Sequence, residues 1–410
     1  MKESPNSTNR SIAGVRKQRH KRLRRVVSLA CLVAAALAVL PITAQGWPSL
    51  AVLSLSPLVA AASALGARTF QATMLIGLLV ALAAVVRRRW FCRWVCPTGR
   101  CANGASRIGL RLGRRCPRVP SLGPWIAWIS LAGALVGYPA LLWLDPLAIF
   151  SGSFSVFRSS GPAAMASAVA LPAVLILSLL LPGAWCGKIC PLGALQDFFY
   201  HAVRAVWPSH APSGNALLRE RRRLLRNVVL GSVMGAVWAA TAKAMRVAMP
   251  RALRPPGARD ETTFLGLCVR CGNCIRVCPS RIIEQDLADH GVAGLLAPVL
   301  RFHEDYCREN CVRCTEVCPS GALARQSLDA KPRQTRIGLP RVDMNLCLLS
   351  NDRECAVCRN SCPYEAISLV FSESEYTLVP VVDAQKCPGC GACEAACPTQ
   401  PVKAIQVLPH

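Results

Sequence analysis

The sequence predicts an α-helical membrane bundle, with four spans plus a fifth anchor helix, followed by a small α+β domain. Three observations support this division. The chain has 410 residues, of which 52% are hydrophobic, more than is usual in a soluble protein of this length. Residues 1–259 contain 33 Lys and Arg against four acids, whereas residues 260–410 contain 15 against 18. Sixteen of the 23 cysteines follow residue 267, in four groups.

Four stretches are long and apolar enough to cross a bilayer, which takes about 20 mainly apolar residues. They are, roughly, residues 26–45, 69–86, 121–142 and 163–181. A fifth stretch, roughly 227–246, is weaker and rich in Gly and Ala. The stretch 47–66 is also apolar, but Pro48 and Pro57 interrupt it. We therefore expect an interfacial or re-entrant segment there rather than a span.

The distribution of Lys and Arg predicts the orientation of these spans. The N-terminal tail contains nine, and the four connections that follow contain one, ten, one and seven. Since cytoplasmic loops carry the excess of positive charge, the N-terminus and the second and fourth connections lie in the cytoplasm. The fifth helix then runs outward and places the C-terminal domain in the periplasm. This arrangement favours membrane lipid over nucleic acid as the surroundings of the basic residues.

An arginine-rich run precedes the fifth helix. Arg221-Arg222-Arg223-Leu224-Leu225-Arg226 has the form of a twin-arginine export signal. Such a signal suits a domain that receives its cofactors in the cytoplasm and crosses the bacterial inner (cytoplasmic) membrane already folded. The alternative is an ordinary positively charged flank of a membrane anchor. Whether this helix is cleaved stays open.

The predicted organisation is therefore a basic cytoplasmic tail, a membrane domain, an anchor or signal helix, a Pro-rich linker and a cysteine-rich domain. These parts span residues 1–25, 26–226, 227–246, 247–266 and 267–410, respectively.

The four C-terminal cysteine groups have the spacing of iron–sulfur ligands. The first and fourth groups match the run C-x2-C-x2-C-x3-C-P of bacterial ferredoxins, and the second and third widen only the first gap. The sixteen cysteines are Cys268, Cys271, Cys274, Cys278, Cys307, Cys311, Cys314, Cys318, Cys347, Cys355, Cys358, Cys362, Cys387, Cys390, Cys393 and Cys397. Three thiolates of a run bind one cluster, and the fourth, before Pro, reaches the partner cluster of a pair.

This spacing predicts four [4Fe–4S] clusters in a ferredoxin-like polycluster domain with brief strands and helical turns. A structural zinc site would use two cysteine pairs separated by a longer loop, and a disulfide framework would not require this repeated run. Adjacent pairing (first group with second, third with fourth) and nested pairing (first with fourth, second with third) both fit the sequence.

The membrane region contains two copies of another cysteine motif. Cys92 and Cys96 follow the second span, and Cys186 and Cys190 follow the fourth, each pair in the pattern C-x3-C-P-x-G. Both copies are predicted at the cytoplasmic end of an inward-running helix, so the four thiols could form a further metal or iron–sulfur site or a dithiol redox pair. The alternative is a structural cap where each helix ends.

Other cofactors have little support in the sequence. None of the six histidines lies in a predicted span and no C-x-x-C-H run occurs, so neither b-type nor c-type haem is expected. No glycine-rich nucleotide motif is present. Asp145, predicted at the outer end of the third span, is a weak catalytic candidate as the proton acceptor from a quinol. The alternative is a turn residue before Pro146.

These motifs resemble two known protein types. The first 225 residues look like the NapH/MauN type of membrane protein, which has four spans and two C-x3-C-P motifs. The remainder is similar to the NapG/MauM type of ferredoxin, which has a twin-arginine leader and four [4Fe–4S] runs. The stretch from Leu253 to Ala258, followed by Cys268-Val269-Arg270-Cys271-Gly272, resembles the start of that ferredoxin's mature domain. The chain would then be a fusion of two subunits that are usually separate.

The resemblance implies a membrane-bound iron–sulfur protein that takes electrons from quinol and passes them to a periplasmic oxidoreductase, as a quinol dehydrogenase subunit would. One alternative is an accessory ferredoxin for maturation of a periplasmic redox enzyme of the methylamine-utilisation or nitrate-reductase type. Another is a redox-sensing regulator, since regulators of the NosR type share the C-x3-C-P motif, although no output domain is recognisable. The expected partners are quinone or quinol, membrane lipid and a periplasmic redox protein.

Overall fold

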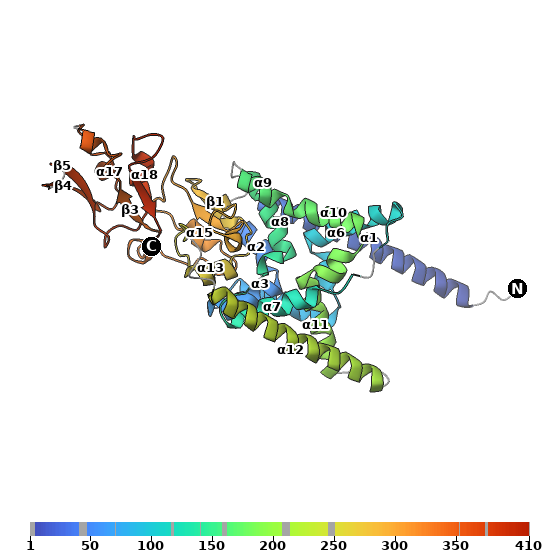
Figure 1. The fold of residues 1–410 in the computed structure, drawn as a ribbon. Coiled ribbons are helices and arrows are strands. Elements are labelled where there is room, and N and C mark those ends of the chain that lie inside the picture. The colour runs from blue at the N-terminus through green and yellow to red at the C-terminus, as the bar shows by residue number, and fades with distance from the viewer. Residues whose placement is uncertain are drawn as a thin grey trace.

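The protein consists of a helical part and a smaller cysteine-rich part, which lie end to end in Figure 1. The computed structural model describes residues 5–40, 47–69, 71–115, 119–139, 141–157, 162–206, 214–244, 251–351, 353–373 and 376–409. The helix α1 projects from the end of the helical part that lies away from the cysteine-rich part.

The helical part is built from α-helices joined by short turns. They are α1 (Pro5–Val39), α2 (Trp47–Ser54), α3 (Pro57–Ala67), α4 (Met74–Val86), α5 (Trp90–Trp94), α6 (Pro97–Arg111), α7 (Gly123–Leu135), α8 (Pro146–Ser153), α9 (Pro162–Ala168), α10 (Ala170–Leu180), α11 (Pro191–Val206) and α12 (Gly214–Ala244). Shorter helical turns are η2 (Leu142–Leu144), η3 (Ser155–Phe157) and the π-turn η4 (Trp185–Ile189).

The cysteine-rich part consists of brief helices and three two-stranded sheets. Its helices are α13 (Glu261–Leu267), α14 (Asn273–Val277), α15 (Arg313–Glu316), α16 (Lys331–Gln334), α17 (Val357–Asn360) and α18 (Ala392–Ala396), with the turns η6 (Val292–Gly294) and η7 (Leu348–Asn351). Its antiparallel strand pairs are β1 (Ile283–Gln285) with β2 (Pro298–Leu300), β3 (Leu339–Val342) with β6 (Ile405–Leu408), and β4 (Ile367–Ser372) with β5 (Thr377–Val382). The expectation of brief strands and helical turns is therefore confirmed.

Glycines allow the long helices to pack closely. A Cβ added at Gly235 of α12 would lie 2.7 Å from the Cβ of Ala132 on α7, and one at Gly77 of α4 would lie 2.8 Å from the Cβ of Ala60 on α3. Because separations this short are not tolerated, only glycine fits these crossings. Small residues at helix crossings are typical of helices that associate without a strong hydrophobic driving force.

The predicted spans form helices, but most are shorter than expected. Among the described residues no single helix is both long and apolar enough to cross a bilayer. The third predicted span ends at Leu135, where Gly137 takes a positive φ of 85°, and the fourth divides at Val169 into α9 and α10. The predicted interruption at Pro57 is confirmed, since α2 and α3 are bent by 90° relative to each other. Only the two helices together are long and apolar enough to cross a bilayer.

The prediction of a four-helix domain over 26–226 was too simple. Three helices that are not predicted spans, α6, α8 and α11, complete the helical part. Helices α6 and α11 begin within the two C-x3-C-P motifs. Their first residues are the motif prolines, Pro97 and Pro191, and Cys96 caps α6. Proline is well suited to the first turn of a helix, where its missing N–H costs no hydrogen bond.

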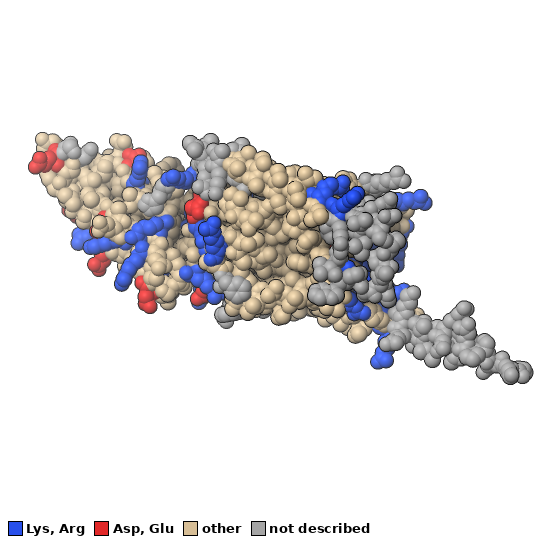
Figure 2. Space-filling model, turned by 90° about the horizontal axis from the view of Figure 1, so that it is seen from below, with Lys and Arg blue, Asp and Glu red and all other residues tan. Residues whose placement is uncertain are grey.

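The surface of the helical part carries a band without charged residues. Figure 2 shows this band on the face in view, between a basic end and the cysteine-rich part, where acidic and basic residues are mixed. Large apolar side chains are exposed on the helices of this part, for example Leu79 on α4, Ile176 on α10 and Val233 on α12. Exposed apolar side chains of this size indicate contact with a partner or a membrane rather than with water.

The predicted linker 247–266 is wrong over most of its length. Its described residues, from 251 on, fold into the cysteine-rich part: the amide of Leu300 donates to the carbonyl oxygen of Leu253 (2.9 Å). The buried guanidinium of Arg254 donates to the carboxylate of Glu261 (2.6 Å) and to the carbonyl oxygen of Pro298 (2.9 Å). The Pro-rich composition suggested a linker, yet these hydrogen bonds give the segment a fixed place.

Helix α8 joins the two parts through buried hydrogen bonds. The hydroxyl of Ser151 donates to the carbonyl oxygen of Cys271 (3.1 Å), and Arg276, which is 2% exposed, donates to the carbonyl and hydroxyl oxygens of Ser151 (both 2.7 Å). Gly152 and Gly272 permit this close approach, since an added Cβ would lie 2.8 Å from the carbonyl oxygen of Arg270 and from the Cβ of Ser155, respectively. The first cysteine group is thus fixed against the helical part.

Substitution of Arg276 by Met should loosen this junction. The change would remove the guanidinium that donates to the two oxygens of Ser151 and to the side-chain oxygen of Asn273, and a hydrogen bond to a charged group contributes about 1.5–3 kcal/mol. Hydrogen exchange should then accelerate in α8 and α14. The control Arg325→Met changes an exposed arginine of the same part and should leave exchange in these helices unaltered; equal protection in both variants would contradict this role of Arg276.

Candidate iron–sulfur sites

Cysteines from the first and second groups come together in two sites. Three cysteines of the first run line one cavity with the last of the second run, and this set is called site 1: Cys268, Cys271, Cys274 and Cys318. The reciprocal set lines a second cavity and is called site 2: Cys278, Cys307, Cys311 and Cys314. Helices α14 and α15, which follow the middle cysteines of the two runs, pack against one another.

The third and fourth groups are paired in the same way, because each run contributes its last cysteine to the site of the other. The set called site 3 comprises Cys362, Cys387, Cys390 and Cys393, whose thiols lie close enough to interact electrostatically. The set called site 4 comprises Cys347, Cys355, Cys358 and Cys397, related in the same way. Of the two pairings that the sequence allowed, the structure therefore shows the adjacent one, and the nested one is wrong.

The two pairs of sites meet at one backbone contact. The amide of Cys307 in site 2 donates to the carbonyl oxygen of Cys390 in site 3 (2.9 Å), and the two thiols also interact electrostatically. The sites therefore follow one another in the order 1, 2, 3, 4, starting from the junction with the helical part. Site 3 takes three cysteines from the fourth group and site 4 takes three from the third group. The order of these two sites in space is therefore the reverse of the order of their groups in the sequence.

The donor sets fit iron–sulfur clusters. None of the sixteen cysteines is exposed, and burial raises the pKa of Cys271 and of Cys390 to about 12. A thiol in this environment loses its proton only when a bound cation replaces it. Among the described residues, no three His, Cys, Asp or Glu side chains are grouped as ligands of a single metal ion. A cluster of four irons needs ligands set further apart.

A buried lysine at site 2 was not predicted from the sequence. Lys331 is 1% exposed, and its ammonium group lies 3.4 Å from the thiol of Cys307 and donates to the carbonyl oxygens of Cys311 (2.7 Å) and Arg308. Burial raises the pKa of Cys307, and the charge of Lys331 partly offsets that rise. The only available signal was a lysine in a segment otherwise rich in arginine. A buried cation beside a ligand favours added negative charge at the site.

The four cysteines of the helical part also come together. The thiols of Cys96 and Cys190 interact electrostatically with each other and with those of Cys92 and Cys186, as the paired motifs predicted. Cys96 and Cys190 also accept hydrogen bonds from the amides of Gly99 (3.3 Å) and Gly193 (3.5 Å) at the starts of α6 and α11. Cys96 and Cys190 therefore both cap a helix and contribute to the converging set, although the sequence left these two roles as alternatives. We call this set the helical site.

Polar residues that sequence analysis did not select surround the helical site. The side-chain amide of Gln196 donates to the thiol of Cys92 (3.3 Å), and Arg89 donates to the carbonyl oxygen of Cys186 (2.8 Å). Arg89 and Arg88 both pair with Asp197, at 2.6 and 2.8 Å. Asp197 lies on α11, one turn after the second motif, so its proximity to the arginines depends on helix packing.

Asp145 does not lie at an outer interface as predicted. It is fully buried, caps α8 by accepting from the amide of Leu147 (2.9 Å), and accepts from the hydroxyl of Ser56 (2.6 Å). It is also within electrostatic range of Cys190. Its two oxygens are thus engaged by a helix cap and a buried hydroxyl, which agrees with the alternative role before Pro146. Proton acceptance by Asp145 stays a prediction.

The pairing of cysteines can be tested by counting iron. Cys271→Ala and Cys318→Ala should each remove the same [4Fe–4S] cluster, so the double variant should lose about four irons, as each single variant does. Combining Cys271→Ala with Cys278→Ala, which belong to different sites, should instead remove about eight irons. Iron and sulfide analysis of anaerobically purified protein measures these losses. Equal losses from both double variants would contradict the assignment of sites 1 and 2.

Lys331→Met should lower the reduction potential of the iron–sulfur centre at site 2. The variant loses both a positive charge and a hydrogen-bond donor next to Cys307, and both stabilise the reduced, more negative form. A redox titration followed by electron paramagnetic resonance measures this shift, with the exposed Lys386→Met as control. An unchanged potential at full iron content would show that Lys331 has only a structural role.

Comparisons with known proteins agree with these sites. Residues 69–115 and 163–210 match the family model of a 4Fe-4S binding domain, and residues 267–322 and 353–400 match that of a 4Fe-4S dicluster domain. The first pair of matches includes all four cysteines of the helical site. The second pair follows the adjacent pairing seen in the structure. No solved structure matches the chain.

Ferredoxin-type proteins are similar to about half of the chain. The methylamine utilization ferredoxin-type protein MauM of Methylobacillus flagellatus is 33% identical over 205 residues, which cover 48% of this chain and 85% of MauM. The ferredoxin-type protein NapG of Escherichia coli is 38% identical over 210 residues, covering 46% of this chain and 85% of NapG. Together with the four cysteine sites, these similarities show that the chain belongs, through its C-terminal half, to the NapG/MauM family of ferredoxin-type iron–sulfur electron-transfer proteins.

Proposed function

We propose that this protein is a membrane-bound relay that carries electrons from the quinol pool to a periplasmic oxidoreductase. The observation that carries this proposal is the row of four cysteine sites, which begins at the junction with the helical part and continues away from it. A row of one-electron centres suits transport of electrons over a distance. In this proposal sites 1 to 4 hold four [4Fe–4S] clusters.

Several features support a membrane location for the helical part. The uncharged band of Figure 2 exposes large apolar side chains, and the basic residues gather at the end away from the cysteine-rich part. This distribution agrees with the positive-inside rule if that end faces the cytoplasm and the cysteine-rich part faces the periplasm. The resemblance of the first 225 residues to the NapH/MauN type, and the arginine run at the start of α12, support the same orientation.

The helical site is the candidate for a fifth iron–sulfur centre. Its four thiols converge, and the segments that contain them match a 4Fe-4S binding domain. The hydroxyl of Thr98, next to this site, donates to the carbonyl oxygen of Pro146 (2.5 Å) at the start of α8. Ser151 follows Pro146 by five residues on α8, about 8 Å along the helix axis, and reaches Cys271 of site 1. A centre at the helical site would thus lie one short helix from the row.

A second candidate function is an accessory role in maturation of a periplasmic redox enzyme. It is the alternative that the resemblance to MauM implies, and the names of the MauM relatives refer to methylamine utilization. In that case the chain would supply electrons during assembly of an enzyme rather than during its turnover. Both functions use the same row of centres but differ in whether quinol is the donor.

Reduction by quinol distinguishes the two functions. Full-length protein, purified anaerobically and placed in lipid nanodiscs, should lose its iron–sulfur absorbance when decylubiquinol or menadiol is added, because the electrons enter the cluster row. Dithionite gives the full extent of reduction as the reference. Clusters that dithionite reduces while both quinols leave them oxidised would contradict the quinol proposal and favour the accessory role.

A further inference from the structure

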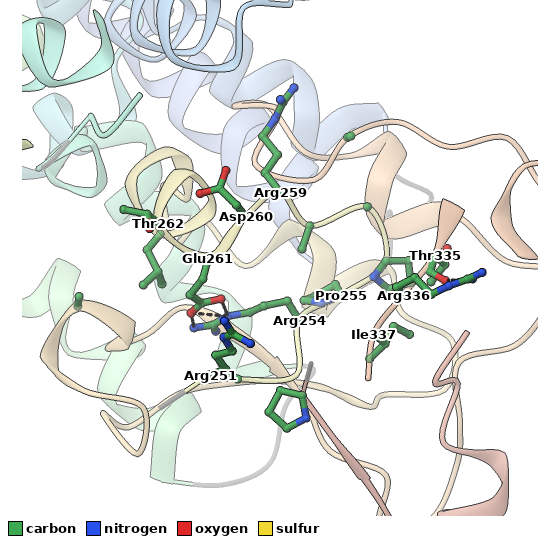
Figure 3. A pocket seen from close by; sticks show the side chains of 18 of the residues that line it. Arg251, Arg254, Pro255, Arg259, Asp260, Glu261, Thr262, Thr335, Arg336 and Ile337 are labelled. Atoms are coloured by element: carbon green, nitrogen blue, oxygen red, sulfur yellow. Dashed lines mark hydrogen bonds and ion pairs between the residues drawn. The ribbon is translucent and has the colours of Figure 1, made fainter. Parts of the chain in front are cut away.

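A large pocket lies where α12 meets the start of the cysteine-rich part. It has a volume of about 960 Å³, which is enough for a ring-shaped headgroup with part of a chain. Its lining includes Trp238 and Thr241 of α12, Tyr138 after α7, and residues between 251 and 265, together with parts of the cysteine-rich part such as residues 334–337. Figure 3 shows the wall formed by Arg254 and Glu261. None of the functions considered so far uses this pocket.

One side of the pocket is formed by α12, which exposes apolar residues next to it. Trp238 is 53% exposed, and Val233, Met234 and Val237 before it on α12 are exposed as well. If the band lies in the bilayer, then a molecule dissolved in the outer leaflet can enter past Trp238 and Thr241. Tryptophan and tyrosine are also the residues that gather at membrane–water interfaces.

The opposite side of the pocket adjoins site 1. Glu261 and Leu265, which line the pocket, belong to α13, and Cys268 is the residue that ends this helix. The guanidinium of Arg254 acts electrostatically on the thiol of Cys268, so the pocket wall and the first cysteine of the row are neighbours. A bound molecule would therefore lie next to the first centre of the proposed relay.

The pocket offers carboxylate acceptors to a ligand that can donate hydrogen bonds. Four arginines line it, Arg251, Arg254, Arg259 and Arg336. Arg254 is engaged with Glu261 (2.6 Å), Arg259 with the carbonyl oxygen of Gly321 (2.9 Å), and Arg336 with that of Thr335 (2.8 Å). The carboxylates of Asp260 and Glu261 also line the pocket and supply the acceptors. Glu261, whose side chain is 30% exposed, can still accept a hydrogen bond from a hydroxyl group.

We propose that this pocket binds the headgroup of a membrane quinol, with one ring hydroxyl donating to the carboxylate of Glu261. This inference rests on the proposed function and gives it a location. Oxidation of a quinol to a quinone breaks two O–H bonds and releases two protons and two electrons. The cysteines of site 1 would hold the one-electron acceptor, which would take up the two electrons in turn, with the first passing on to site 2 before the second is transferred. The protons pass to Glu261 and the exposed Asp260, and from there to water on the periplasmic side.

Two variants test the pocket in full-length protein held in phosphatidylcholine nanodiscs. Glu261→Gln keeps the shape of the side chain but removes its charge, so the rate of reduction by decylubiquinol should fall about tenfold or more. Thr241→Trp adds bulk at the mouth, on an exposed position of α12, and should abolish binding of decylubiquinone measured by titration calorimetry. Reduction by dithionite and iron content should match the wild type in both variants.

Glu284→Gln is the matched control, because Glu284 also pairs with an arginine (Arg301, 3.4 Å) but does not line the pocket. Wild-type rates in Glu261→Gln and unaltered binding in Thr241→Trp would overturn the assignment of the pocket while leaving the proposed function intact. Lipid mass spectrometry gives a further outcome. If phosphatidylglycerol stays bound to the wild type but is lost from Thr241→Trp, the pocket is an anionic-lipid site, and its assignment to quinol is overturned too. If quinol fails to reduce even the wild type, the proposed function fails, and the binding measurement still decides whether the pocket takes quinone.

Discussion

Sixteen cysteine side chains, none of them exposed, form much of the interior of the cysteine-rich part. Burial raises the pKa of Cys271 and of Cys390 among them to about 12, so these two thiols stay protonated until iron takes the place of the proton. Most of these cysteines belong to the hydrophobic clusters that would otherwise form the core, and within the described residues the strands contribute three short two-stranded sheets. Folding of this part and acquisition of its clusters are therefore one event. Its helices of four or five residues around the cysteines could not persist alone.

A second feature of the cysteine-rich part is a pair of buried cationic side chains. Arg276 lies among the groups of site 1, and Lys331 lies against Cys307 of site 2. A buried charge is costly without partners, and both side chains find theirs in backbone carbonyl oxygens. They also compensate the negative charge that cluster-bound thiolates bring into the protein. The first pair of sites is thereby set in a more positive environment than its ligands alone would create.

The sequence predicted the chemistry better than it predicted the architecture. Cysteine spacing is imposed by the cluster itself, which is why both the sixteen C-terminal cysteines and the convergence of Cys92, Cys96, Cys186 and Cys190 could be recognised. The choice between adjacent and nested pairing depends on contacts between α14 and α15 and between α17 and α18, which spacing does not encode. The helices α6, α8 and α11 could not be predicted as spans because none of them is a long apolar run in the sequence. Asp145 was misplaced for the same reason, since the start of α8 lies inside the helical part.

The junction between α8 and the first cysteine group has a consequence for how the protein meets its acceptor. Some electron carriers swing a mobile head between donor and acceptor, but here Ser151, Arg276 and the close-fitting Gly152 fix the head in place. In the proposed relay, delivery would therefore occur at a stationary outlet, near site 4 at the far end of the row. An acceptor would have to travel to that outlet, and its rate of arrival and departure would set the upper limit on turnover.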